Sequence, residues 1–401
     1  MSIQEQYDTY PYPARNPKDE RKRLVRGSPS HPVEMDHYLW GGKRNWREPI
    51  RILVAGGGTG DALVQLAQVL TTAKRDYEIT YLDLSTTARE IAEARIAERR
   101  LQNVTFHTAS LLDAPEYGEF DYIDCCGVLH HLPEPDLGFQ ALSKALSPEG
   151  GLGMMVYAPY GRSGVYALQE AFGALSRGMT AKDRLRLGKS GLRKLPEAHP
   201  FKRNQVLVDH KKSDAGFYDL LLHSQDRPYS VGQLAEALSG AGMKPASFLP
   251  AAQYDLRSLL PEGAEVPEGM DWIEAMDVAE KLRGTIKTHI VYAVAEGREV
   301  PEVDVTDPWA VPHLKSLAGP QLAGLVAKKG RIVLDFQTES AMLKIPKEAA
   351  PILTAIDGQT PLKMIRERVG MDEIAFASLW RQVHEALVPW NELNYSKLYR
   401  P

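Results

Sequence analysis

A glycine-rich turn between a buried strand and an amphipathic helix constrains this chain more than any other segment. Residues 51–61 read Arg-Ile-Leu-Val-Ala-Gly-Gly-Gly-Thr-Gly-Asp, and the apolar run before the glycines is typical of a buried parallel strand. Residues 62–70 then place apolar side chains at helical spacing. Glycines in such a strand-to-helix turn allow a sharp reversal and let a ligand approach main-chain N–H groups. The glycines of this turn are Gly56, Gly57, Gly58 and Gly60.

A second predicted strand, residues 78–84, places an acidic side chain one helix and one strand after the glycine turn. This residue is Asp83. An acid at this position can accept hydrogen bonds from both hydroxyls of a ribose held over the glycines. At this point a glycine turn that serves packing alone and a nicotinamide dinucleotide site both remain alternatives.

The segment after the fourth predicted strand decides between these alternatives. Residues 120–132 read Phe-Asp-Tyr-Ile-Asp-Cys-Cys-Gly-Val-Leu-His-His-Leu, and Pro-Glu-Pro follows. Together with the glycine turn and Asp83, this stretch resembles the Rossmann-like (class I) S-adenosylmethionine-dependent methyltransferases over about residues 50–160. A His-His-Leu-Pro stretch does not belong to the layout of a nicotinamide dehydrogenase, which is therefore disfavoured.

The resemblance implies S-adenosyl-L-methionine as the cofactor. It implies that the glycine turn holds the methionine portion, Asp83 the ribose and Ser110 the adenine edge, with Gly127 near the reacting centre. The cofactor-binding residues expected from it are Gly56, Gly57, Gly58, Gly60, Asp83, Leu84, Ser110, Leu111, Gly127 and Val128.

Two positions depart from the family pattern. Many members carry an acid in the first strand, where this chain has Val54, and an aspartate after the third strand, where this chain has Ser110. A serine hydroxyl can still accept a hydrogen bond from the adenine amino group. Asp113 comes three residues too late for that contact, and we interpret it as a helix cap.

Composition and charge exclude several other classes. The 401 residues carry a net charge of −4, so no overall field attracts the chain to nucleic acid or an anionic membrane. The two cysteines, Cys125 and Cys126, are adjacent in a strand and point to opposite faces, which disfavours a disulfide and a thiolate metal cage. His130 and His131 have no partner set at ligand spacing, so we expect no metal. Without a signal-peptide pattern or an apolar run of membrane-spanning length, we expect a cytoplasmic protein. A tyrosine- and proline-rich stretch like residues 7–13 recurs in some bacterial methyltransferases, so the resemblance implies a bacterial protein.

The chain divides into three predicted parts. Residues 1–50 form an N-terminal arm, in which Tyr10 and Tyr12 either close over the site as a lid or pack on the domain surface. Residues 51–300 form the cofactor domain, an α/β fold with a mixed, mainly parallel seven-stranded sheet. Residues 243–249 and 288–294 are its last two strands.

Residues 161–230 interrupt the sheet pattern and form a helical insertion, with predicted helices at 165–175 and 217–222. In the family such an insertion commonly covers the acceptor pocket, and by that resemblance Tyr218, Asp219 and His223 are candidates to line it. Residues 171–212 contain 11 Lys and Arg against 3 Asp and Glu. Because aromatic residues for base stacking are nearly absent there, we favour a solvated helical surface over a nucleic-acid site.

Residues 301–401 read as a separate module. A proline-rich linker precedes a strand pair at 331–336 and 341–345, and helices follow at 351–356, after Thr360, and at 372–387. This pattern faintly resembles the winged-helix-like regulatory regions attached to some bacterial methyltransferases. No basic recognition helix stands out, so protein contact or homodimerisation is favoured over DNA.

The sequence therefore predicts an S-adenosylmethionine-dependent methyltransferase with an unidentified acceptor, slightly favouring a protein or peptide side chain. The catalytic candidates are His131, Tyr218 and His223. For His131 a pocket wall or helix-start group is the favoured alternative, and a role as anchors of the insertion fits Tyr218 and His223 at least as well. A non-catalytic cofactor-binding or interaction protein of the same fold remains an alternative, as do small-molecule and RNA methyltransferases.

Overall fold

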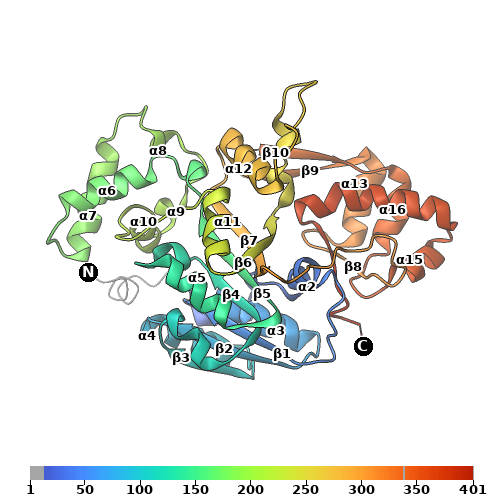
Figure 1. Ribbon diagram of the computed structural model, residues 1–401, viewed down its shortest axis with the longest axis horizontal. Helices are drawn as coiled ribbons and strands as arrows, with labels where there is room; N and C mark the ends of the chain where they lie inside the picture. Colours follow the sequence, from blue (N-terminus) through green and yellow to red (C-terminus); the bar gives the residue numbers. More distant parts are fainter. Residues whose placement is uncertain (1–12, 337–338, 401) are drawn as a thin grey trace.

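The computed structural model describes residues 13–336 and 339–400 and shows three parts: a central α/β domain, a helical insertion and a C-terminal module (Figure 1). The central sheet has seven strands in the order β3-β2-β1-β4-β5-β7-β6. Only β7 runs antiparallel to its neighbours, β5 and β6. The mixed, mainly parallel seven-stranded sheet expected from the sequence is confirmed. Its strands are β1 Ile50–Ala55, β2 Tyr77–Asp83, β3 Val104–Thr108, β4 Phe120–Cys126, β5 Leu146–Tyr157, β6 Met243–Leu249 and β7 Thr288–Ala295.

Helices cover both faces of this sheet, as parallel strands require. One face packs against α5 (Pro135–Lys144) and α11 (Val231–Gly240), with α12 (Trp272–Arg283) at its edge. The other face packs against α3 (Asp61–Thr72) and α4 (Thr86–Glu98). Ser85 caps α4 by accepting a hydrogen bond from the Ala88 N–H group, as its position before the helix predicts.

The N-terminal segment is part of the core rather than an arm over residues 32–40. Helix α2 (Pro32–Trp40) is almost wholly buried, and Met35 and Leu39 pack with the β1 and α3 side chains. The sequence did not indicate this helix, because its apolar periodicity is weak. The periodicity is weak because polar side chains of the helix are buried along with the apolar ones. The lid expected at Tyr10 and Tyr12 lies outside the described residues.

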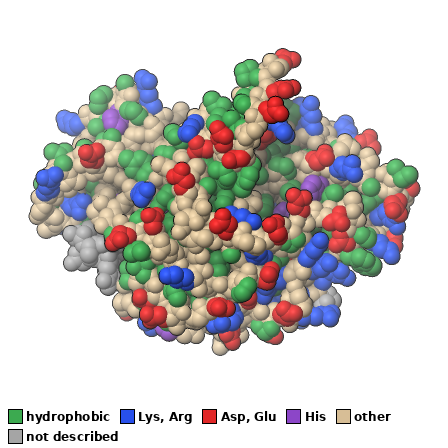
Figure 2. Space-filling model, in the orientation of Figure 1, with side chains coloured by type: hydrophobic (Ala, Val, Ile, Leu, Met, Phe, Trp, Pro, Cys, Tyr) green, Lys and Arg blue, Asp and Glu red, His purple; other side chains and the backbone are tan. Residues whose placement is uncertain are grey.

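The insertion forms a small helical unit with its own apolar cluster. It follows the sequence prediction closely at α6, whereas its last helix begins earlier than the expected residue 217. The helices are α6 Val165–Leu175, α7 Ala181–Lys194, α8 Pro200–Arg203, α9 Asp209–Lys212 and α10 Asp214–Leu221. Lys and Arg side chains are scattered along the outer edge of this unit (Figure 2). Positive and negative side chains are interspersed over the rest of the molecular face shown in that view.

The C-terminal module has its own core and contains more elements than the sequence indicates. The expected strand pair and three helices are present, but α13 and a second strand pair, β8 with β11, were not foreseen. Pro361 rather than Thr360 precedes α15. The elements are β8 Pro312–Leu314, α13 Gly319–Lys329, β9 Arg331–Phe336, β10 Glu339–Lys344, α14 Ala350–Thr354, α15 Leu362–Val369, α16 Glu373–Leu387 and β11 Leu393–Tyr395. The winged-helix-like interpretation stays a prediction.

Short 3-10 helices complete the chain and several of them flank the strand ends. They are Pro17–Arg21, Leu111–Tyr117, Leu129–His131, Tyr160–Arg162, Ala251–Tyr254, Leu256–Leu259, Lys347–Ala349 and Val388–Trp390.

Candidate functional site

A cavity of about 780 Å³ lies along the carboxyl ends of β1, β2, β4 and β5. This is the edge at which open α/β sheets bind their ligands. All ten residues expected to bind the cofactor are part of its lining: Gly56, Gly57, Gly58, Gly60, Asp83, Leu84, Ser110, Leu111, Gly127 and Val128. The structure therefore brings together, at one cavity, turns that are far apart in the sequence.

Two glycines of the turn leave no room for a side chain. A Cβ atom at Gly56, whose φ is +67°, would lie 2.5 Å from the Val128 side chain. One at Gly57 would lie 2.3 Å from the Tyr81 ring. The Tyr81 hydroxyl donates a hydrogen bond to the Gly58 carbonyl oxygen at 2.6 Å. The turn is thus held against its neighbours by packing, and its shape does not depend on a bound ligand.

Asp83 is fixed by backbone donors on both of its oxygens. The Gly58 N–H group donates to Oδ2 at 2.7 Å and the Ser85 N–H group to Oδ1 at 2.8 Å. Each carboxylate oxygen can accept a second hydrogen bond. Asp83 is therefore held in a fixed orientation beside the glycine turn, at the edge of the cavity where a ribose is expected.

Ser110 and Asp113 form a reciprocal cap at the start of the 3-10 helix Leu111–Tyr117. The Ser110 hydroxyl accepts from the Leu112 N–H group at 3.1 Å, and the Asp113 carboxylate accepts from the Ser110 N–H group at 3.2 Å. The interpretation of Asp113 as a cap agrees with this geometry. Ser110 lines the cavity and keeps its hydroxyl proton and one lone pair for a ligand.

The other end of the cavity is polar and is built by β5 and the insertion. His131, Tyr157, Asp219 and Gln225 line it. The Tyr157 hydroxyl donates to the Asp219 carboxylate at 3.0 Å, and His131 Nδ1 lies 2.9 Å from the Gln225 carbonyl oxygen. Since a carbonyl oxygen only accepts, this contact places the imidazole proton on Nδ1 and leaves Nε2 as an acceptor.

The three catalytic candidates do not occupy equivalent places. His131 lines the cavity, whereas Tyr218 and His223 are not among its lining residues. The His223 ring stacks on His131 with 3.9 Å between centroids, so it lies directly behind the wall. Tyr218 is fully buried in the core of the insertion, under the guanidinium of Arg184.

Burial keeps these histidines neutral. It lowers the pKa of both His131 and His223 to about 4. His130, beside them, is also buried and its pKa is lowered well below the ordinary value for the same reason. This end of the cavity therefore contains neutral imidazoles at physiological pH.

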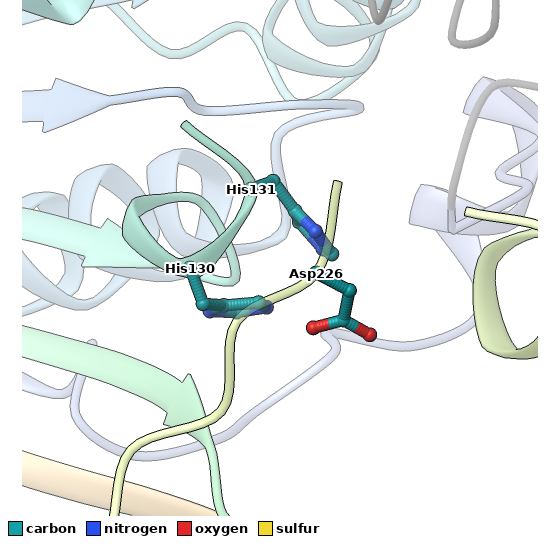
Figure 3. Close-up of side chains that lie close together, drawn as sticks. All are labelled: His130, His131 and Asp226. Carbon is teal, nitrogen blue, oxygen red and sulfur yellow. The ribbon is translucent and has the colours of Figure 1, made fainter. Parts of the chain in front are cut away.

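A cluster of imidazoles and carboxylates surrounds this wall (Figure 3). The ligand-type atoms of His130, His131 and Asp226 lie within 4.8 Å of one another, and so do those of His131, Asp219 and His223. His131, Asp219 and His223 were already candidates for this region, but sequence spacing could not show that they meet, because the insertion supplies three members of the set from nearly one hundred residues away. The spacing would suit one metal ion.

Two features lead us to interpret the cluster as a polar wall. The Arg162 guanidinium already forms an ion pair with Asp226 at 3.3 Å and lies 3.6 Å from the centroid of the Tyr157 ring, so a cation is present. The His131 and His223 rings are stacked at 25°, which directs their in-plane lone pairs along nearly parallel lines rather than toward one point.

Several lining residues escaped the sequence analysis. Tyr157 ends β5 and could have been found by the same strand-end rule that identified Asp83. Arg15 carries no such signal and reaches the cavity through its ion pair with Asp61, at 2.5 Å, in the first turn of α3. Asp124 and Gln225 were also missed.

No helix among the described residues combines the length and the apolar character that crossing a lipid bilayer requires.

Comparisons with known proteins agree with this geometry. Residues 53–152 match the family model described as "Methyltransferase domain". An uncharacterized protein from Synechococcus sp. is 34% identical over 199 residues, which are 48% of this chain and 47% of that protein. The magnesium-protoporphyrin O-methyltransferase of Rhodobacter capsulatus is 32% identical over 88 residues, 22% of this chain and 36% of that enzyme. The chain thus spans about half or less of the length of the curated relatives it matches.

The solved structure of PKMT2 from Rickettsia typhi in complex with AdoHcy shares the fold. It superposes with a TM-score of 0.60 at 16% identity and covers 91% of this chain and 75% of its own. The family match covers the glycine turn, Asp83 and β4, which are the elements that line the cavity. Residues 53–152 therefore match a methyltransferase domain in sequence, and the chain shares its fold with a solved structure that holds AdoHcy.

Proposed function

We propose that this chain transfers a methyl group from S-adenosylmethionine to an acceptor that enters the end of the cavity lined by His131 and Asp219. One observation carries the proposal: a single cavity joins the strand ends that suit the cofactor to a polar wall supplied largely by the insertion. The two reactants can therefore meet in one enclosure. Its volume lies in the range typical of small-molecule sites.

Methyl transfer from a sulfonium is a direct displacement, in which the acceptor lone pair forms a bond to the methyl carbon as the carbon–sulfur bond breaks. The sulfur leaves as a neutral thioether, so the protein needs no acid for the leaving group. Its work is to align the two reactants and to exclude water. We assign the methionine portion to the glycine turn, the ribose to Asp83 and the adenine edge to Ser110.

A protic acceptor must also lose a proton, to solvent or to a base. His131 is the candidate base, because its Nε2 atom is the acceptor nitrogen and its side chain lines the cavity. With a pKa of about 4 it is a weak base, so we assign it the role of orienting the acceptor and receiving the proton during transfer. His223 supports its ring, and Tyr218 anchors the insertion behind them.

We favour a protein or peptide side chain as the acceptor over a small molecule. The insertion contributes Asp219 to the wall, and a buried carboxylate there suits an amino group that arrives as a cation. The insertion contributes Asp219 and Gln225 to the lining of the cavity, and its helices form a separate unit beside the sheet (Figure 1) on which a polypeptide can rest. An RNA acceptor remains the alternative that the basic outer edge of the insertion would serve.

The first experiment measures S-adenosylhomocysteine binding by calorimetry with the wild-type protein and Asp83→Ala. We expect Asp83→Ala to weaken binding by about 10-fold or more, because two charge-assisted hydrogen bonds are lost. Glu90→Ala, which removes an exposed carboxylate from α4, is the control and should bind as the wild type does. Equal binding by Asp83→Ala and the wild type would remove the ribose assignment.

The acceptor class is tested by measuring S-adenosylhomocysteine release with panels of peptides, small molecules and RNA. Release of S-adenosylhomocysteine with peptides as the acceptor, and no release when free amino acids or RNA replace the peptides, supports the preferred class. Cofactor binding without turnover on any panel would favour the alternative of a non-catalytic cofactor-binding protein.

A further inference from the structure

The cofactor brings a charged group for which the sites described above provide no partner. The methionine portion of S-adenosylmethionine carries an α-ammonium, and the product S-adenosylhomocysteine keeps it. The position in β1 at which many family members carry an acid is Val54. An apolar side chain at this position cannot neutralise a cation, so a carboxylate that does so must lie elsewhere in the lining of the cavity.

The neighbouring strand supplies one at the same level of the sheet. Val54 of β1 pairs directly with Asp124 of β4 in the parallel register. Neighbouring strands lie about 4.8 Å apart, so the carboxylate of Asp124 is displaced by one strand from the family position. Both residues line the cavity, together with Cys126 two residues further along the same face of β4.

Asp124 is built as a buried acid that lacks a cation. It is only 1% exposed, and its carboxylate accepts hydrogen bonds from the side chains of Ser30, Cys126 and Tyr122, the last at 3.3 Å. Among the described residues no Lys or Arg forms an ion pair with it, whereas Asp61, also at the cavity, pairs with Arg15 and Arg95. Burial raises the pKa of Asp124 to about 6. A bound cation would offset this cost of desolvation.

We propose that Asp124 is the subsite for the α-ammonium of the cofactor, taking over from β4 the charge that Val54 cannot provide from β1. The proposal rests on the cofactor occupying this cavity, as the proposed function requires. It also explains why a chain with an apolar residue in β1 keeps an acid inside a central strand, where a buried carboxylate without a cation costs stability.

The ligand series separates the ammonium from the rest of the cofactor. S-adenosylhomocysteine carries the ammonium and the carboxylate, a deaminated analogue keeps only the carboxylate, and 5′-methylthioadenosine lacks both. Calorimetry measures the dissociation constant of each ligand with the wild type and with Asp124→Asn. The matched control is Asp121→Asn. Asp121 lies near the other end of the same strand, where its carboxylate accepts a hydrogen bond from the Arg51 N–H group, and it is not among the residues that line the cavity.

We expect Asp124→Asn to weaken S-adenosylhomocysteine binding by about 10- to 100-fold and to leave 5′-methylthioadenosine within about 3-fold of the wild type. The deaminated analogue should bind the wild type and Asp124→Asn equally, because the group that Asp124 contacts is absent. Asp121→Asn should leave the affinity of all three ligands unchanged.

An equal loss for all three ligands would overturn the proposal and make Asp124 a structural residue of the sheet. So would an unchanged preference for S-adenosylhomocysteine over its deaminated analogue. If Asp124→Asn fails to fold, Val54→Asp combined with Asp124→Asn returns the acid to β1 and should restore the preference. The wild type alone also gives a test, since equal affinity for S-adenosylhomocysteine and the deaminated analogue excludes any ammonium subsite.

These outcomes are distinct from failure of the proposed function. A protein that binds S-adenosylhomocysteine in this pattern but methylates no acceptor would retain the ammonium subsite and lose the methyl-transfer role. A wild-type protein that binds none of the three ligands would overturn both.

Discussion

At the scale of single residues, the acceptor end of the cavity depends on imidazoles that are kept neutral by burial. His131 and His223 are 4% exposed each and stack on one another, so a proton on either ring would be desolvated and would face the other ring. The His131 proton is held on Nδ1 by the Gln225 carbonyl oxygen. The arrangement leaves Nε2 of His131 as a hydrogen-bond acceptor on a side chain that lines the cavity.

We predict that the His131 and His223 imidazole signals will titrate in the folded protein with midpoints near pH 4 rather than near the ordinary 6.5. The unfolded chain then binds more protons than the folded chain between these values. The stability contributed by both groups is therefore fully present above about pH 6.5 and is lost as the pH falls toward 4, by up to about 3 kcal/mol each.

Proton NMR of the imidazole Cε1–H resonances checks this prediction, with His131→Gln and His223→Gln used to assign the signals. Midpoints near 6.5 would show that the rings are solvated and that the wall is not closed.

Asp36 and Asp124 change the stability with pH in the opposite direction between about pH 3.8 and 6, because burial raises the pKa of both to about 6. The NMR midpoints, unlike the overall unfolding curve, are independent of these carboxyls.

At the scale of elements, a buried ion pair joins the beginning of the insertion to its end. Arg162 follows β5 and Asp226 follows α10, and their side chains are 4% and 0% exposed. Gln169 of α6 donates a second hydrogen bond to Asp226 at 3.0 Å. Buried pairs of this kind add little net stability, but the loss of one partner leaves a buried charge uncompensated. The pair therefore fixes the position of the wall that carries Asp219 and Gln225.

We predict that Arg162→Met will lower the free energy of unfolding by about 3–5 kcal/mol, because Asp226 stays buried without its cation. Adding Asp226→Asn should recover part of the loss by removing the charge. Urea denaturation followed by far-ultraviolet circular dichroism measures both. Arg186→Met is the matched control, since Arg186 pairs with Asp183 on the exposed face of α7 and its loss should change little. A similar small effect for Arg162→Met would mean that water reaches the pair.

At the scale of the whole molecule, the end of the chain returns to the central domain. The Tyr395 N–H group donates to His37 Nδ1 at 3.2 Å and the Ser396 hydroxyl to the Asp36 carboxylate at 2.6 Å, both on α2. Arg75, after α3, donates to the Leu398 carbonyl oxygen at 2.8 Å and also to that of Arg400. The C-terminal module is thus fastened to the cofactor domain by its last strand as well as by its linker.

We predict that Leu398→Ala will destabilise the cofactor domain by about 2–5 kcal/mol, because Leu398 is fully buried in the cluster that contains β1, α2 and α3. Thermal and urea unfolding measure the change. Ile374→Ala is the control for the module, since Ile374 is 83% exposed and its truncation should alter stability by less than about 0.5 kcal/mol. An unchanged unfolding midpoint for Leu398→Ala would show that the chain end is not part of the domain core.

The sequence alone determined the cofactor half of the site. Gly56, Asp83, Ser110 and Gly127 could be placed at one edge because each follows a predicted strand, and consecutive parallel strands bring their carboxyl ends together. Apolar periodicity likewise located β6 and α6 at their observed bounds. These signals are local: a strand, a turn and a helix are encoded in neighbouring residues, and the parallel α/β arrangement supplies the rest.

Only the tertiary structure decided the remainder, because it depends on contacts between residues distant in the chain. Asp124 looks like any strand residue until the register places it beside Val54. The pairing of Tyr157 with Asp219 and the burial of Leu398 join segments that share no periodic signal. Helix α2 was missed because its surroundings, rather than its own pattern, bury its polar side chains. Packing and register, which no short stretch of sequence specifies, complete this site.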